Sequence, residues 1–74
     1  MPHVTIQMYP GRDDALKAKA AQSVTEALVK SLGISKETLS VSVEDVPQAE
    51  WGAKVLAYRE GGNKKLFVSK GDVL

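Results

Sequence analysis

The sequence predicts a small α/β protein built around a single βαβ unit. Three observations predict this fold. The chain has 74 residues, which is too short for two domains. Two segments alternate apolar and polar residues with a period of two, and an alanine-rich stretch with helical periodicity lies between them. Two strands joined by one helix through short connections are expected to lie parallel with a right-handed crossover, so we expect residues 1–74 to form one domain.

The first strand is predicted over residues 3–9. Val4, Ile6 and Met8 fall on one face and alternate with polar residues, which is typical of a strand buried on one side. The dipeptide Pro10-Gly11 favours a turn and ends the strand.

A long helix is predicted over residues 15–32, where the composition is helix-forming and contains no proline or glycine. Asp13-Asp14 in front of it suit the positive end of a helix dipole, and Gly33 is a natural stop. At 100° per residue the apolar side chains fill a broad arc. This arc consists of Leu16, Ala20, Ala21, Val24, Ala27, Leu28 and Leu32.

The second strand is predicted over residues 39–46, again with alternating apolar and polar positions, and Pro47 ends it. The polar segment before it, residues 35–38, favours a turn or one helical turn capped by Ser35.

The remaining chain is predicted to form a short C-terminal helix or hairpin. Residues 48–58 favour a short helix, a glycine pair breaks it, and residues 66–68 favour a final strand or an extended arm. Two strands and one helix leave a sheet with an open edge and a poorly covered face. A chain of this length also hides only about 60% of its unfolded surface. Self-association is therefore expected.

Composition excludes several functions. Ten basic against nine acidic residues give a net charge of +1, which argues against a nucleic-acid binder. The absence of cysteine excludes thiolate chemistry, and a single histidine excludes a multi-histidine metal site. No apolar run approaches the roughly 20 residues of a membrane span, and no secretory signal is visible. A soluble cytoplasmic protein without metal or membrane association is the expectation.

Proline at position 2 is the one feature with catalytic potential. If Met1 is removed, Pro2 carries a secondary amine that no internal residue can imitate. An ordinary α-amino group has a pKa of about 8, so roughly a tenth is uncharged at pH 7. Desolvation penalises the cation, and a pKa lowered to about 7 would leave half of the amine available as a general base. The alternative is that Pro2 simply begins a strand.

Several residues in register resemble one known family. Met1-Pro2 is followed by a strand, by Gly11-Arg12 opening an alanine-rich helix, by a second strand and by residues 44–51 (EDVPQAEW), an acidic-Pro-x-x-x-Trp stretch. Over about residues 2–52 the chain resembles the tautomerase superfamily, and within it the short 4-oxalocrotonate tautomerase-like members. His3 and the longer tail look most like the PptA (YdcE-like) branch. The resemblance implies the βαβ tautomerase (MIF-like) fold, with a four-stranded sheet per dimer.

The resemblance also implies roles for individual residues. Pro2 would be the general base, which takes a proton from an enol or from a carbon next to a carbonyl and returns it elsewhere on the substrate without any cofactor. Arg12 matches the family arginine that binds a substrate carboxylate and draws electron density. Trp51 stands where the family has an aromatic wall. The structural alternatives are an ion pair of Arg12 with Asp13 or Glu26, and a role of Trp51 as a core or interface anchor.

One position departs from the family pattern. Members that act on dicarboxylates carry a second arginine in the second strand, and this chain has Ser40 at that register. A serine can hydrogen-bond to a substrate but brings no charge, so one bidentate carboxylate clamp is missing. A monocarboxylate such as an aryl enolpyruvate therefore fits better than a dicarboxylate, and a 2-hydroxydienoate remains the other candidate. Lys54, Arg59 and Lys65 are the basic residues of the tail that could restore a charge.

His3 is also a candidate substrate-binding residue. The functional interpretation is that it holds or polarises the substrate near Pro2, and the favoured alternative is a hydrogen-bonded interface or surface histidine. For the whole protein, the competing class is an oligomeric small-molecule-binding module that keeps the fold without the chemistry.

Strand length limits how the site can be assembled. At about 3.3 Å per residue, residues 2–9 span roughly 23 Å, more than twice the length of a small enol acid. Pro2 and Arg12 of one chain should therefore not reach the same substrate, and Arg12 would come from another subunit. Two units placed edge to edge with antiparallel strands would provide this arrangement. We expect a homodimer, with a trimer of dimers as the family's other common state.

Overall fold

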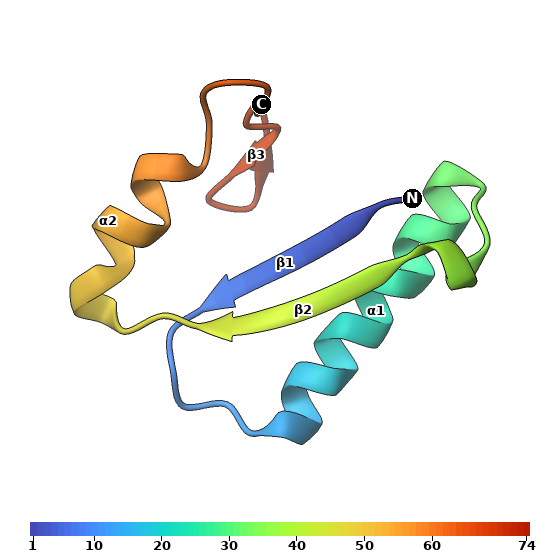
Figure 1. Cartoon of the computed structure of the whole chain (residues 1–74), viewed down its shortest axis with the longest axis horizontal. Helices are drawn as coiled ribbons and strands as arrows, with labels where there is room; N and C mark the ends of the chain where they lie inside the picture. Colours follow the sequence, from blue (N-terminus) through green and yellow to red (C-terminus); the bar gives the residue numbers. More distant parts are fainter.

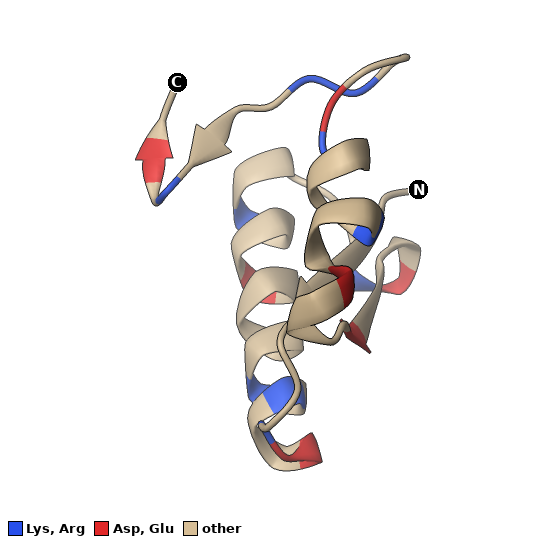
Figure 2. Ribbon diagram, turned by 90° about the vertical axis from the view of Figure 1, so that its left-hand side faces the viewer, with Lys and Arg blue, Asp and Glu red and all other residues tan.

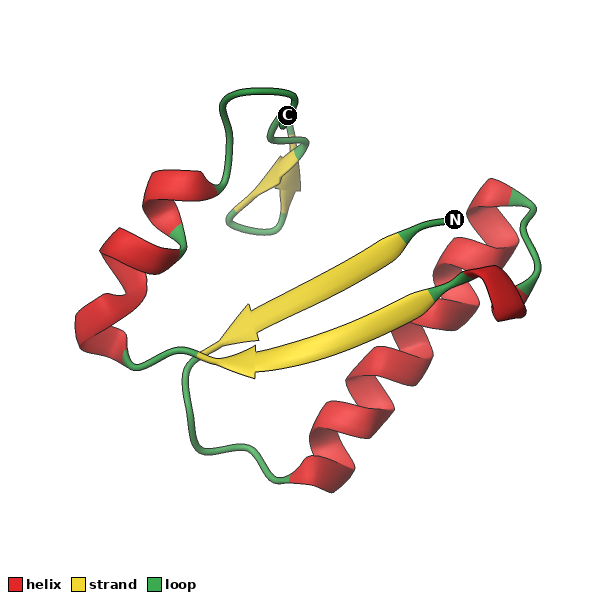
Figure 3. Ribbon diagram, in the orientation of Figure 1, coloured by secondary structure: helices red, strands yellow, loops and turns green.

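The computed structural model describes all 74 residues and contains the predicted βαβ unit (Figures 1 and 3). Strand β1 (His3–Met8) leads through a loop into helix α1 (Asp14–Leu32), which returns the chain to the start of strand β2 (Ser40–Asp45). The two strands pair in parallel with no slip in register, and α1 packs against one face of the sheet, mainly over β2. This arrangement confirms the α/β prediction.

Both strands are slightly shorter than predicted. β1 ends at Met8, one residue before Tyr9, and β2 lacks one predicted residue at each end. Hydrogen bonding continues beyond the last strand pair, since the Val46 N–H donates to the Met8 carbonyl at 2.8 Å. Val46 is the one fully buried residue, with 1% of its surface exposed. The carboxyl end of the strand pair is therefore the best packed point of the chain.

Both ends of α1 are capped by the residues that the sequence indicates. The Asp13 carboxylate accepts a hydrogen bond from the Leu16 N–H at 2.9 Å, which satisfies one of the unpaired donors of the first turn. Gly33 ends the helix in the left-handed conformation (φ 65°, ψ 36°), and its N–H donates to the Val29 carbonyl. A side chain would be strained in this conformation.

The face of α1 that packs on the sheet is shifted relative to the predicted arc, toward Thr25 and Val29. Leu16 and Leu32, at the edges of the arc, remain 53% and 57% exposed, since Leu16 lies outside the packed face and Leu32 is the last residue of the helix. Two positions inside the packed face are not apolar, since Lys17 and Thr25 are half-buried there. The packed face consists of Lys17, Ala20, Ala21, Val24, Thr25, Leu28 and Val29.

The connection between α1 and β2 contains a short 3-10 turn over Lys36–Thr38. The predicted cap at Ser35 is wrong in its chemistry. The Ser35 hydroxyl donates to the Glu37 carboxylate instead of accepting from a backbone N–H, because a charged acceptor two residues away competes with the backbone.

The C-terminal region contains both a short helical segment and a hairpin. The predicted helix over residues 48–58 is a series of three short turns, with helix α2 (Trp51–Lys54) in the middle. Gly52 within this segment disfavours a longer helix. The hairpin consists of β3 (Val68–Ser69) and β4 (Asp72–Val73), so the strand predicted at residues 66–68 overlaps β3 by one residue.

The single chain leaves much of its surface uncovered. A folded monomer of 8.0 kDa exposes about 4,500 Å², whereas this chain exposes 5892 Å². Each of the two long strands is paired on one side, so the outer edge of β1 is open. Charged residues of both signs are interspersed rather than gathered on one face (Figure 2). No helix combines the length and the apolar composition that crossing a membrane requires.

Candidate active site

The site residues singled out from the sequence lie at opposite ends of the strand pair. Pro2, His3 and Ser40 lie at its amino end, whereas Arg12 and Trp51 follow its carboxyl end. β1 keeps one register with β2 along its whole length and does not fold back. At about 3.3 Å per residue the two groups are therefore roughly 20 Å apart along the strand.

Pro2 is anchored at the first position of the sheet. Its carbonyl accepts the Ser40 N–H at 3.3 Å, and its ring is half-buried. Met1 in front of it is fully exposed. The Met1–Pro2 peptide bond is therefore accessible, while Pro2 itself is held in place.

His3 lies on the sheet face that α1 leaves open, among hydroxyl groups. Its Nδ1 is 2.6 Å from the Ser40 Oγ. Its Nε2 is 3.4 Å from the Thr5 Oγ1 and 3.5 Å from the Ser42 Oγ, at the limit of hydrogen bonding. The imidazole therefore has one short hydrogen bond across the strands and no charged partner.

The acids of the strand pair lie at its other end. Glu44 accepts a hydrogen bond from the Gln7 amide at 2.8 Å, and Asp45 is the last residue of β2. Neither strand carries an acid in its amino-terminal half. The surroundings of Pro2 within the sheet are therefore polar but uncharged.

Arg12 lies in the exposed loop between β1 and α1. Gly11 before it has a φ of 125°, a conformation that side chains rarely adopt, so glycine allows the chain to turn there. The proposed structural alternative for Arg12, an ion pair with Asp13 or Glu26, is not formed. The ion pairs of the chain join Lys17 to Asp14, Lys17 to Asp45 and Lys54 to Glu50.

Trp51 forms an aromatic pair with Tyr9. The ring centroids are 4.8 Å apart with an interplanar angle of 75°, an edge-to-face geometry that contributes about 0.5–1.5 kcal/mol beyond burial. Tyr9 is 43% exposed and lies three residues before Arg12. From the sequence we expect only a structural role for Tyr9. Its position directly after the first strand, three residues before Arg12, was the feature that could have indicated a place near the site.

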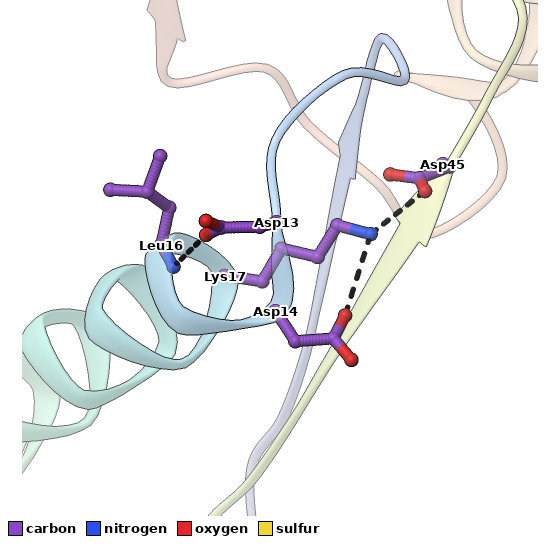
Figure 4. Close-up of polar contacts among 5 residues, drawn as sticks. All are labelled: Asp13, Asp14, Leu16, Lys17 and Asp45. Carbon is purple, nitrogen blue, oxygen red and sulfur yellow. Dashed lines mark hydrogen bonds and ion pairs between the residues drawn. The ribbon is translucent and has the colours of Figure 1, made fainter.

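Lys17 is a second residue that the sequence analysis missed. Its Nζ lies 2.8 Å from the Asp45 Oδ2 and 4.0 Å from the Asp14 Oδ1 (Figure 4). The hydrogen bond to Asp45 raises the pKa of Lys17 above its ordinary value, and the nearby negative charges act in the same direction. The sequence feature that could have revealed Lys17 is its position one turn before Ala20, on the helix face that packs on the sheet.

The basic residues of the tail do not gather at one position where they could replace the missing second arginine. Lys54 is bound to Glu50 at 2.8 Å, and this hydrogen bond raises the pKa of Lys54. Lys65 lies over the Phe67 ring at 5.5 Å, and Arg59 is exposed beyond the last helical turn.

No pocket is formed within the single chain. No group of three or more histidine or acidic side chains is arranged to hold a metal ion. A substrate at Pro2 or at Arg12 of one isolated chain would therefore be open to water on several sides.

A βαβ unit with Pro2 at the start and Arg12 just beyond the end of its first strand is the arrangement expected of a small tautomerase. A comparison with protein families agrees, since the family described as "Tautomerase enzyme" matches residues 2–59. The chain belongs to this family of isomerases.

Individual relatives support the same assignment. A probable tautomerase of Xylella fastidiosa is 34% identical over 74% of this chain and 67% of its own length. The 2-hydroxymuconate tautomerase of Comamonas testosteroni is 34% identical over 84% of this chain and 98% of its own length. Among solved structures, a 4-oxalocrotonate tautomerase isozyme of Methylibium petroleiphilum superimposes with a TM-score of 0.64 at 33% identity, covering 69% of this chain and 82% of its own.

Proposed function

We propose that the chain is a cofactor-independent keto–enol tautomerase that acts on a small enol monocarboxylate, an aryl enolpyruvate or a 2-hydroxydienoate. Pro2 is its general base and Arg12 its carboxylate-binding residue. The observation that carries the proposal is the division of the strand pair into an amino end at Pro2 without acidic residues and a carboxyl end that is followed by an unpaired guanidinium and by an aromatic pair. The family match, which begins at residue 2, supports it.

The chemistry requires one base that both accepts and returns a proton. After removal of Met1, the Pro2 nitrogen takes the proton of the enol hydroxyl, and the electrons of that O–H bond form the carbonyl. The displaced electrons of the double bond then take the proton from Pro2 at a carbon of the conjugated system. The product is the keto or conjugated isomer, and Pro2 is uncharged again.

Two features favour an uncharged Pro2 amine at neutral pH. The half-buried ring lies at an end of the sheet where neither strand carries an acid that would stabilise the cation. A positive charge brought next to it, that of the partner subunit's Arg12, would further disfavour a second positive charge and lower the amine pKa.

Arg12 reaches the reacting substrate only from a second copy of the chain. The length of β1 separates Pro2 from Arg12 by roughly 20 Å within one chain, and the outer edge of β1 is free. Antiparallel pairing of two β1 edges forms a four-stranded sheet and brings the start of one β1 near the end of the other. Each dimer then has two sites, and each site uses Pro2 of one chain and Arg12 of its partner.

The exposed surface supports this self-association. The chain exposes 5892 Å², about 1,400 Å² more than a compact monomer of its mass. A standard interface covers about 800 Å² of each partner. A homodimer accounts for most of this excess, and a trimer of dimers would cover more.

The substrate class follows from the residues at the amino end. Ser40 and His3 bind each other at this end, and neither strand carries an arginine or a lysine, so a second carboxylate has no bidentate clamp there. On the resemblance of His3 and the long tail, we also propose that the chain is of the PptA-like branch. As a direct test, Ser40→Arg should raise the ratio of activity on 2-hydroxymuconate to activity on phenylenolpyruvate, whereas Ser42→Arg, two residues further along the same face, should raise it less.

The first experiment tests the base. Intact mass should show that Met1 is removed, and phenylenolpyruvate should be converted to its keto form. Replacing Pro2 by alanine should slow this step by about 100-fold, the low end of general-base contributions, with circular dichroism confirming the fold. A retained Met1, or equal rates for both proteins, would contradict the enzyme and favour a binding module.

The second experiment tests the shared site. Pro2→Ala and Arg12→Ala proteins are unfolded, mixed in equal amounts and refolded together. About half of the dimers should be mixed, each with one intact site of two, so about a quarter of the wild-type activity is expected. Mixed dimers, verified by native mass spectrometry, that recover no activity would contradict assembly across the interface.

A further inference from the structure

The Arg12 guanidinium is unpaired in spite of its neighbours. Asp13 and Asp14 follow it directly, and Asp45 ends the strand next to the loop that carries it. A guanidinium binds carboxylates readily, often through two hydrogen bonds. The absence of an ion pair of Arg12 therefore has to be explained by what these carboxylates bind instead.

Each of the three neighbouring carboxylates already has another partner. Asp13 accepts the Leu16 N–H at 2.9 Å as the helix cap. Asp45 accepts a hydrogen bond from the Lys17 ammonium at 2.8 Å, and the fully exposed Asp14 carboxylate lies 4.0 Å from the same group (Figure 4). One lysine thus holds Asp45 and attracts Asp14 at the carboxyl end of the strand pair.

Lys17 is well placed to keep this arrangement. It comes from the sheet-facing side of α1, and its side chain is 19% exposed, while that of Asp45 is 38% exposed. A pair that is partly shielded from water is less weakened by solvent and salt than an exposed one. The hydrogen bond to Asp45 also raises the pKa of Lys17, so the lysine is charged at every pH at which a tautomerase would be assayed.

We propose that Lys17 is a positioning residue for Arg12: by holding the Asp45 carboxylate and attracting that of Asp14, it keeps the Arg12 guanidinium free for a substrate carboxylate. This inference rests on the proposed role of Arg12. Without Lys17, two adjacent acids lose their counter-ion, and Arg12, two residues before Asp14, is the next cation in the loop. An internal carboxylate then competes with the carboxylate of the substrate for one guanidinium.

The test measures carboxylate binding separately from turnover. Phenylacetate, an unreactive carboxylate, is titrated against nitrogen-15-labelled protein, and the Arg12 Nε–H signal is followed. Lys17→Met should weaken phenylacetate binding by about threefold to fivefold, the size of a partly shielded charge interaction. It should raise the KM for phenylenolpyruvate by a similar factor with little change in kcat.

The chain offers a matched control. Lys19→Met removes the same charge from the same helix, but Lys19 is exposed and in no ion pair, so its binding of phenylacetate should stay at the wild-type value. Lys17→Arg keeps the cation and should also bind normally. Equal weakening in the Lys17→Met and Lys19→Met proteins would overturn the positioning role, because net charge alone would then explain the effect.

A triple variant separates competition from loss of structure. Lys17→Met/Asp14→Asn/Asp45→Asn removes the competing acids together with the lysine, and it should recover wild-type affinity even if Lys17→Met lowers the melting temperature. Persistent weak binding in the triple variant would overturn the inference. The proposed role of Arg12 is tested separately, since Arg12→Ala must itself weaken phenylacetate binding. If it does while Lys17→Met does not, the positioning role alone is wrong.

Discussion

The two ends of the β1–β2 strand pair carry different chemistry. At the amino end, Pro2 pairs with Ser40 through the backbone, the His3 imidazole binds the Ser40 hydroxyl, and neither strand has an acid in its amino-terminal half. At the carboxyl end, an unpaired guanidinium, an aromatic pair and a lysine bound to two acids lie around the loop into α1. One end suits a base that must stay uncharged, and the other suits the binding of an anion.

This difference explains why a single chain is not a sufficient catalyst in our proposal. A base without a carboxylate clamp cannot orient its substrate, and a clamp without a base cannot move a proton. The rigid strand pair keeps the two ends apart, and antiparallel pairing with a second copy brings opposite ends together. The following predictions test how independent the two ends are, from the largest expected effect to the smallest.

Apart from the loss of the base in Pro2→Ala, the largest effect is expected at the carboxyl end. Arg12→Ala should lower kcat/KM for phenylenolpyruvate by about 100-fold, because a charged hydrogen bond to the substrate contributes about 1.5–3 kcal/mol. Steady-state kinetics with Arg12→Lys as the control should show partial activity, since lysine keeps the charge but not the bidentate geometry. Wild-type kinetics of Arg12→Ala would remove this end from the site.

An intermediate effect is expected from the aromatic pair. Trp51→Ala should lower kcat/KM by about tenfold for an aryl enolpyruvate and less for an aliphatic 2-hydroxydienoate, because an aryl ring loses more apolar contact. Tyr9→Phe keeps the ring and should behave like the wild type, whereas Tyr9→Ala should resemble Trp51→Ala. Equal losses on both substrates would indicate that Trp51 only anchors the tail.

The charge network at the same end predicts a pH dependence of stability. Because the folded state raises the pKa of Lys17, its contribution is complete below the unfolded value of 10.5 and is lost as the pH rises through the higher folded value. The difference in urea midpoint between the wild type and Lys17→Met should therefore shrink above pH 10.5. The Lys19→Met protein should show no such change relative to the wild type, and a difference that grows with pH would contradict the assignment.

The smallest effect is expected from His3 at the amino end. His3→Gln keeps a hydrogen-bonding side chain next to Ser40, so turnover of phenylenolpyruvate at pH 7.5 should change by about twofold or less. A tenfold loss in kcat with an unchanged circular dichroism spectrum would instead assign His3 a direct part in the reaction, and the amino end would then contain more than one functional group.

Much of this architecture could be predicted from local patterns. The segments with a period of two predicted the bounds of both strands to within one residue at each end. Asp13 and Gly33 predicted where α1 begins and ends. These features depend on residues adjacent in the sequence, whose conformational preferences act over one or two turns. The secondary structure of the tail was harder to predict, because its segments are too short to show a hydrophobic period. The structure contains both the short helix and the hairpin that were predicted as alternatives.

The sequence by itself determined the βαβ unit, the positions of Pro2 and Arg12 at opposite ends of one strand, and hence their separation. Only the tertiary structure decided that Lys17 binds Asp45, that Tyr9 packs on Trp51 and that His3 binds Ser40. The physical reason is that these pairs join residues far apart in the chain. Their contacts depend on the register of β1 against β2 and on where α1 and α2 lie, and packing of the whole chain fixes both.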